Sequence, residues 1–135
     1  MAAMIGEMDI DKLLALLQPA LLDGEYVFCS SPSLGYGDLD ELQPISCYQE
    51  QEGLSLLLSK SAADSAGLSY SSVFCGITLS VHSSLDAVGF TAAVAKKLAR
   101  NGISANVIAA HYHDHVFVPA DKAKLALALL REFES

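Results

Sequence analysis

The sequence predicts an α+β fold, and the second half of the chain carries that prediction. Residues 73–81 alternate between apolar and small or polar side chains, as a half-buried strand does. Residues 85–101 have helical periodicity, with cations in the last turns. Residues 103–112 and 115–119 are β-branched segments with a two-residue link, which predicts a hairpin. A final helix over 121–133 completes the order β-α-β-β-α.

This order is that of a ferredoxin-like βαββαβ unit without its last strand. Ser84 is the expected N-cap of the central helix, because its hydroxyl can accept a hydrogen bond from a first-turn amide. Asp86 would then lie in the first turn, near the positive end of the helix dipole. The small side chains of Val88, Ala92 and Ala95 are expected to pack on the sheet.

The first half predicts the order α-β-β-β-α. Its first helix is expected from Asp11 to Leu22, and Pro19 should end or kink it. The remaining expected elements are three strands, a long loop over 31–44 and a short helix, with the strands at 25–30, 45–51 and 54–60 and the helix at 61–67.

We therefore expect two interlocked ferredoxin-like modules with antiparallel sheets, an N-terminal one over 1–68 and a C-terminal one over 69–135. The second module lacks one strand by this count. The first half can supply it, and residues 25–30 are the expected donor.

Composition excludes several classes of protein. The chain has 135 residues, of which 52% are hydrophobic and 18% charged, so disorder is not expected. The net charge of −8 argues against a nucleic-acid or anionic-membrane partner. No apolar run approaches the ~20 residues that cross a bilayer. Three cysteines without CxxC spacing predict buried thiols, and with no signal-peptide pattern the expected location is the cytoplasm.

Histidines cluster at the expected hairpin. His111, His113 and His115 alternate by two, a spacing compatible with metal ligation, and Asp114 or His82 could add to such a set. A tight turn would instead aim these side chains apart, leaving them to bind backbone groups or an interface. Histidine also titrates near neutral pH, so pH-sensitive binding is a third interpretation.

No pattern in the chain predicts catalysis. An enzyme would have to combine Cys75, Ser83 or Ser84 with the histidines and Asp114. The sequence contains neither a GxSxG nucleophile elbow nor a glycine-rich phosphate loop. We expect a protein that is not an enzyme and has no cofactor.

Two strings, SSLDAVG and HYHDHVFVP, carry a resemblance to a known family. They lie in the longer stretch 81–119, and LLALLQPALLDGEYVFCS, YQEQEGLSLLL and ALALLREF extend the likeness over nearly the whole chain. The chain resembles small bacterial proteins made of two ACT-like modules. Their layout is similar to half of the cytosolic arginine sensors of animal cells.

The resemblance implies a regulatory or sensor protein that binds a small molecule, most simply an amino acid, at a module or subunit interface. It also implies a homodimer or a higher homo-oligomer. The ligand-binding residues that it implies are His82, Ser83, Ser84, Leu85, Asp86, Ala87, Val88, Gly89, His111, Tyr112, His113 and Asp114. The amides of residues 84–87 would hold a carboxylate, and Asp86 and Asp114 would recognise an ammonium or guanidinium group. The alternative is a protein-interaction subunit that binds no small ligand.

Overall fold

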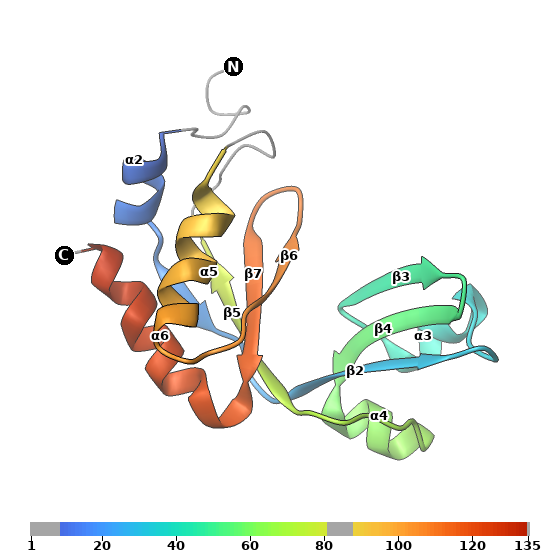
Figure 1. Ribbon diagram of the computed structural model, residues 1–135. Coiled ribbons are helices and arrows are strands. Elements are labelled where there is room, and N and C mark those ends of the chain that lie inside the picture. Colours follow the sequence, from blue (N-terminus) through green and yellow to red (C-terminus); the bar gives the residue numbers. More distant parts are fainter. Residues whose placement is uncertain (1–8, 81–87, 135) are drawn as a thin grey trace. The chain divides into compact units, whose positions relative to one another are not determined.

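The computed structural model describes residues 9–80 and 88–134 and divides the chain into two compact units. Unit 1 is formed by Met1–Asp23 and Cys75–Ser135, and unit 2 by Gly24–Phe74. The chain therefore leaves unit 1 after its N-terminal segment and returns to it inside a strand (Figure 1). This division differs from the contiguous halves 1–68 and 69–135 expected from the sequence, although the interlocking of the two parts agrees with that expectation.

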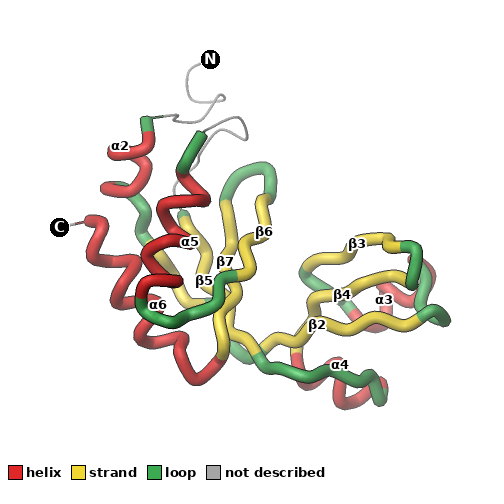
Figure 2. The backbone as a smooth tube through the Cα atoms, in the orientation of Figure 1, coloured by secondary structure: helices red, strands yellow, loops and turns green. Residues whose placement is uncertain are grey.

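Unit 1 is a four-stranded antiparallel sheet with helices on one face (Figure 2). Strand β5 pairs with β1 on one side and β7 on the other, and β7 pairs with β6. The elements in chain order are α2 (Ile10–Ala15), β1 (Pro19–Leu21), β5 (Phe74–Leu79), α5 (Phe90–Arg100), β6 (Asn106–Ala109), β7 (Asp114–Pro119), η2 (Ala120–Lys122), α6 (Ala123–Arg131) and η3 (Glu132–Glu134).

Strand β1 supplies the edge strand that the second half lacks. Pro19 was expected to end or kink a helix, but α2 already ends at Ala15, and Pro19 opens a strand antiparallel to β5. Gln18 makes the turn between them with a left-handed φ of 43°. The expectation that residues 25–30 donate this strand was wrong, because Tyr26–Ser31 pairs along its whole length with β4.

The core of unit 1 lies between the sheet and its helices. Helix α5 buries Phe90, Val94 and Leu98, so the expected small-residue face was wrong, and Val88 is 83% exposed. Pairs of buried residues on β5 and β7 face these helices, and α2 and α6 close the layer. The fully or almost fully buried members of this core are Leu13, Leu17, Ile77, Leu79, Phe90, Val94, Leu98, Ile103, Val116, Val118, Ala123, Ala126, Leu129 and Leu130.

Unit 2 repeats the same plan on a smaller scale and has its own core around Val27, Leu54, Leu56 and Leu58. Its strand order is β3-β4-β2, and Tyr26 of β2 lies opposite Phe74. The loop expected over 31–44 contains a turn of 3-10 helix and a short α-helix. The elements are β2 (Tyr26–Ser31), η1 (Tyr36–Asp38), α3 (Leu39–Leu42), β3 (Ser46–Glu50), β4 (Gly53–Ser59) and α4 (Lys60–Ala66).

The α+β, ferredoxin-like fold expected from the sequence is confirmed in both units. The expectation for the cysteines holds in part: Cys29 is buried and Cys75 half-buried, but Cys47 is exposed. Burial raises the pKa of the Cys29 thiol, which keeps it protonated and unreactive. No helix within residues 9–80 and 88–134 has the length and apolar character needed to span a membrane.

A matched pair of leucines tests whether the N-terminal segment belongs to unit 1. Leu17 is fully buried in the core of unit 1, whereas its neighbour Leu16 is 56% exposed. Leu17→Ala should lower the free energy of unfolding by about 2–5 kcal/mol, because it leaves a cavity. Leu16→Ala should change it by less than about 0.5 kcal/mol. Urea denaturation measures both, and equal effects would contradict the assignment of this segment to the core.

Candidate functional site

The candidate site lies at one end of the sheet of unit 1. Strand β5 ends there at Leu79, helix α5 begins there after Gly89, and the turn 110–113 joins β6 to β7 there (Figure 1). We call this region the hairpin end of unit 1. The turn is closed by a backbone hydrogen bond of 3.1 Å from the Ala110 amide to the His113 carbonyl oxygen.

Asp114 is the one buried polar or charged residue found among the residues that the structure describes, with 7% of its surface exposed. It opens β7 and pairs with Ala109 of β6. Side chains two and four residues along a strand share its face, and Val116 and Val118 belong to the core. The Asp114 carboxylate therefore lies on the helix-covered face, where the apolar row of β7 ends.

The surroundings of Asp114 disfavour its charge. Burial raises the pKa of the Asp114 carboxyl above its ordinary value, and the nearby imidazoles of His115 and His113 offset only part of that effect. A carboxylate of this kind gains more than an exposed one when a cationic group reaches it, because the pair then restores the solvation lost on burial.

His115 lies on the opposite face of the same strand. Its Nδ1 is 3.0 Å from the Thr78 hydroxyl oxygen of β5. Burial is the main cause that lowers the pKa of His115, the charge of His113 adds to it, and Asp114 opposes it. Because Asp114 and His115 point to opposite faces, they do not form a joint ligand set. Thr78 was missed by sequence reasoning, although the alternation along β5 places it on the outer face.

Two further histidines, His111 and His113, lie in the turn before β7. His111 and Tyr112 are exposed and their rings meet edge to face at 4.8 Å between centroids. His113 is half-buried. Within the described parts of the chain, no three His, Cys, Asp or Glu side chains come together as a group that could hold a metal ion.

The predicted binding loop is described only at its end. His82, Ser83, Ser84, Leu85, Asp86 and Ala87 lie outside the described residues. The central helix begins at Phe90 and not at Leu85, and its N-cap is Gly89 with a φ of 90°, so the expected cap at Ser84 was wrong. A left-handed φ of this size favours glycine, which also brings no side-chain acceptor to the first-turn amides.

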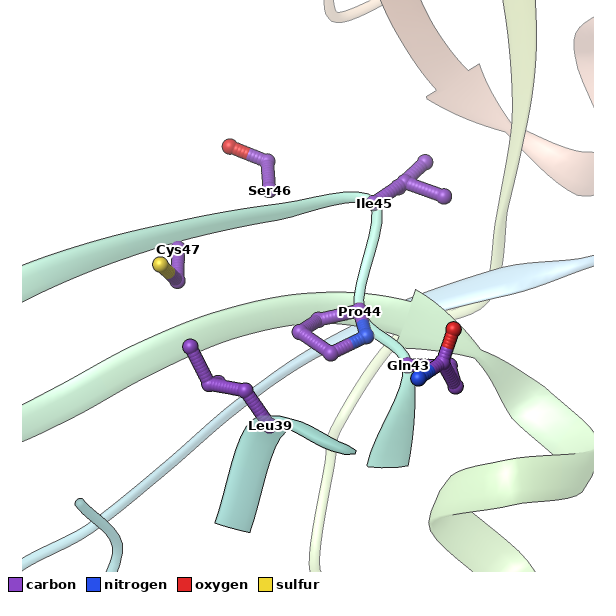
Figure 3. Close-up of a pocket in the computed structure, with 6 residues that line it drawn as sticks. All are labelled: Leu39, Gln43, Pro44, Ile45, Ser46 and Cys47. Carbon is purple, nitrogen blue, oxygen red and sulfur yellow. The ribbon is translucent and has the colours of Figure 1, made fainter. Parts of the chain in front are cut away.

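Unit 2 carries a shallow surface pocket of about 420 Å³ that the sequence did not predict (Figure 3). It lies between the end of α3 and the start of β3, and its lining has no charged side chain. The lining residues are Leu39, Gln43, Pro44, Ile45, Ser46 and Cys47. Recognition of a charged small molecule needs an opposite charge or several hydrogen-bond donors, so this pocket is a weaker candidate than the hairpin end of unit 1.

Several solved structures share this fold. A Vibrio cholerae protein of unknown function, described as a possible transport protein, is 50% identical, with a TM-score of 0.85 over 93% of this chain and 95% of that one. An Agrobacterium tumefaciens protein is 18% identical, with a TM-score of 0.66 over 86% and 87%. The regulatory subunit of aspartate kinase from Thermus thermophilus, in its ligand-free form, is 12% identical, with a TM-score of 0.58 over 90% and 99%.

No functionally curated protein matches the sequence. Two family models do match, both described as ACT domain, over residues 5–75 and residues 72–132. ACT domains are regulatory modules that generally bind small molecules such as amino acids. The two matches therefore support a regulatory, amino-acid-sensing role without naming the amino acid. This chain belongs to the ACT-domain family and carries two ACT domains in tandem.

Proposed function

We propose that this protein is a regulatory protein that binds a free amino acid at the hairpin end of unit 1. The observation that carries the proposal is the burial of the Asp114 carboxylate. An amino acid offers an ammonium group with three donors, and such a group would pair with this carboxylate in a charge-assisted contact. No covalent chemistry is needed, and the proposed role is binding alone.

The start of helix α5 supports the other half of the recognition. Helix amides near an N-terminus carry partial positive charge, which favours an anionic group such as a carboxylate. Helix α5, with Gly89 as its N-cap, begins at the same end of the sheet as the turn between β6 and β7 (Figure 1). Asp114 opens β7 directly after that turn. A zwitterion could therefore contact a buried anion and a positive helix end at once, which neither group offers alone.

A second candidate function, a protein-interaction subunit without a small ligand, is favoured by the edge strand β3 of unit 2. Tyr48 is 75% exposed on this strand, and Ile45 just before it is 50% exposed. Edge strands with exposed aromatic and aliphatic side chains suit pairing with another chain. This candidate predicts no response to amino acids, so the same experiment separates the two functions.

Thermal unfolding with each of the twenty amino acids tests the proposal. A ligand present at 100 times its dissociation constant adds ~2.7 kcal/mol to the free energy of unfolding. We expect at least one amino acid to raise the melting temperature of the wild-type protein. Asp114→Asn should lose most of this rise, and Asp121→Asn, which changes an exposed aspartate of the same unit, should keep it. A flat response to all twenty, or a full response in Asp114→Asn, would overturn the proposal.

The raised pKa of Asp114 predicts that its charge lowers the free energy of unfolding of the ligand-free protein. A carboxyl whose pKa rises on folding weakens the folded state where it is ionised, and this cost disappears as the pH falls through the raised pKa. Asp114→Asn should therefore raise the free energy of unfolding at pH 7, by on the order of 1 kcal/mol.

The gain in the free energy of unfolding that Asp114→Asn brings should shrink as the pH falls from 7 towards the pKa of an unfolded aspartate, about 3.9. Loss of the Asp114 charge would also lower the pKa of His115 further, which acts in the same direction at acid pH. Urea denaturation at several pH values measures the difference, with Asp121→Asn as control. A large loss of stability in Asp114→Asn at pH 7 would show that the carboxylate already has a structural partner.

A further inference from the structure

We propose that Glu134 is a positioning residue for the hairpin end of unit 1, through the peptide group that joins Leu17 to Gln18. The inference rests on the amino-acid site proposed above and adds a means of control to it. It does not place Glu134 in contact with a ligand. Its basis is a pair of hydrogen bonds that link turn η3, through the Leu17–Gln18 peptide group, to Ser80, the residue that follows β5.

The first contact of this connection joins residues that are far apart in the sequence. The Gln18 amide donates to Glu134 Oε1 over 2.7 Å. Gln18 has a left-handed φ of 43°, which a residue with a side chain adopts only at a cost. A carboxylate acceptor makes the stronger, charge-assisted kind of hydrogen bond, so Glu134 stabilises a backbone corner that is otherwise unfavourable.

The second contact uses the other side of the same peptide group. The Ser80 amide donates to the Leu17 carbonyl oxygen over 3.1 Å. The Leu17 carbonyl and the Gln18 amide belong to one planar peptide unit, so neither can rotate without the other. Hydrogen bonds in such a chain also polarise one another. Glu134 thus orients the Leu17 carbonyl oxygen, which accepts from the Ser80 amide directly after the end of β5.

Turn η3 is itself held by α5. Lys97 forms an ion pair of 2.9 Å with Glu132 and lies 4.8 Å above the ring of Phe133. The Glu132 side chain is 59% exposed, so solvent and salt weaken this pair. Turn η3 is therefore expected to open more easily than the core, and salt should favour its opening. When it opens, the Leu17–Gln18 peptide loses its acceptor and Ser80 is less firmly held.

Amide exchange at Ser80, measured by NMR on the full-length protein, tests the connection. Glu134→Ala should speed the exchange of the Ser80 amide roughly two- to tenfold, the factor expected for loss of one hydrogen bond. Glu134→Gln keeps an acceptor oxygen and should stay within about twofold of wild type. Asp121→Ala, an exposed acid of the same unit, should leave Ser80 unchanged. The amide of Leu98, in the core of unit 1, reports whether each variant remains folded.

Affinity provides the functional readout. For any amino acid that stabilises the wild-type protein, Glu134→Ala should weaken binding by roughly two- to tenfold, because the ligand must then order this end of the sheet. Unchanged Ser80 exchange in Glu134→Ala, an equal change in Asp121→Ala, or faster exchange with unaltered affinity would each overturn the inference. If none of the twenty amino acids raises the melting temperature of the wild-type protein, the proposed function is overturned. The exchange rate of the Ser80 amide would still show whether Glu134 acts on Ser80.

Discussion

The pairing of a short N-terminal strand with β5 is the constraint on which unit 1 depends. Three residues of β1 pair with β5, and the flanking hydrogen bonds run from Ser80 to Leu17 and from Leu22 to Gly76. These contacts join segments separated by the whole of unit 2. Closing so long a loop costs conformational entropy before any contact forms, so the burial of Leu17 and Pro19 must compensate for it. Both the N-terminal and the C-terminal segment therefore contribute strands to the sheet of unit 1.

Close packing on the outer face of the sheet reinforces the same pairing. Gly76 has no side chain, and a Cβ atom at this position would come within 2.6 Å of the Phe117 ring and 2.8 Å of Leu22. Phe117 is only 1% exposed, so its ring has little freedom to move away. The glycine thus lets β5 lie between an aromatic ring of β7 and the end of the N-terminal segment.

Asp114 sits where two physical demands conflict. The face of β7 that bears Val116 and Val118 is suited to apolar side chains, and a carboxylate continues that row at the hairpin end. Burial makes the charged form of this carboxyl costly, which is why its pKa is raised. Proteins keep such locally unfavourable residues mainly where binding or catalysis uses them. For this reason Asp114, and not the more numerous histidines, is the centre of the proposed site.

Sequence reasoning reached about half of the candidate site. The hairpin was predicted from the two β-branched segments, but its link was placed at His113 and Asp114. The structure instead places the turn at 110–113 and opens β7 at Asp114, so the placement of Asp114 in the turn was wrong. The start of α5 was placed five residues too early, because a serine before an acidic residue is a common cap pattern, whereas the structure caps the helix at Gly89. Thr78 and Glu134 could not be predicted, because their partners are distant in the chain.

The sequence by itself determined the α+β class, the alternating core face of β5, the helix from Lys60 to Ala66 and the membership of the ACT family. These features depend on local periodicity, on caps and on motifs that lie within one segment. Only the tertiary structure decided that Pro19–Leu21 is a strand, which residues make up each compact unit, and that Asp114 is buried. The physical reason is that a three-residue edge strand and a buried carboxylate have no local pattern, since both exist only through contacts made across long sequence distances.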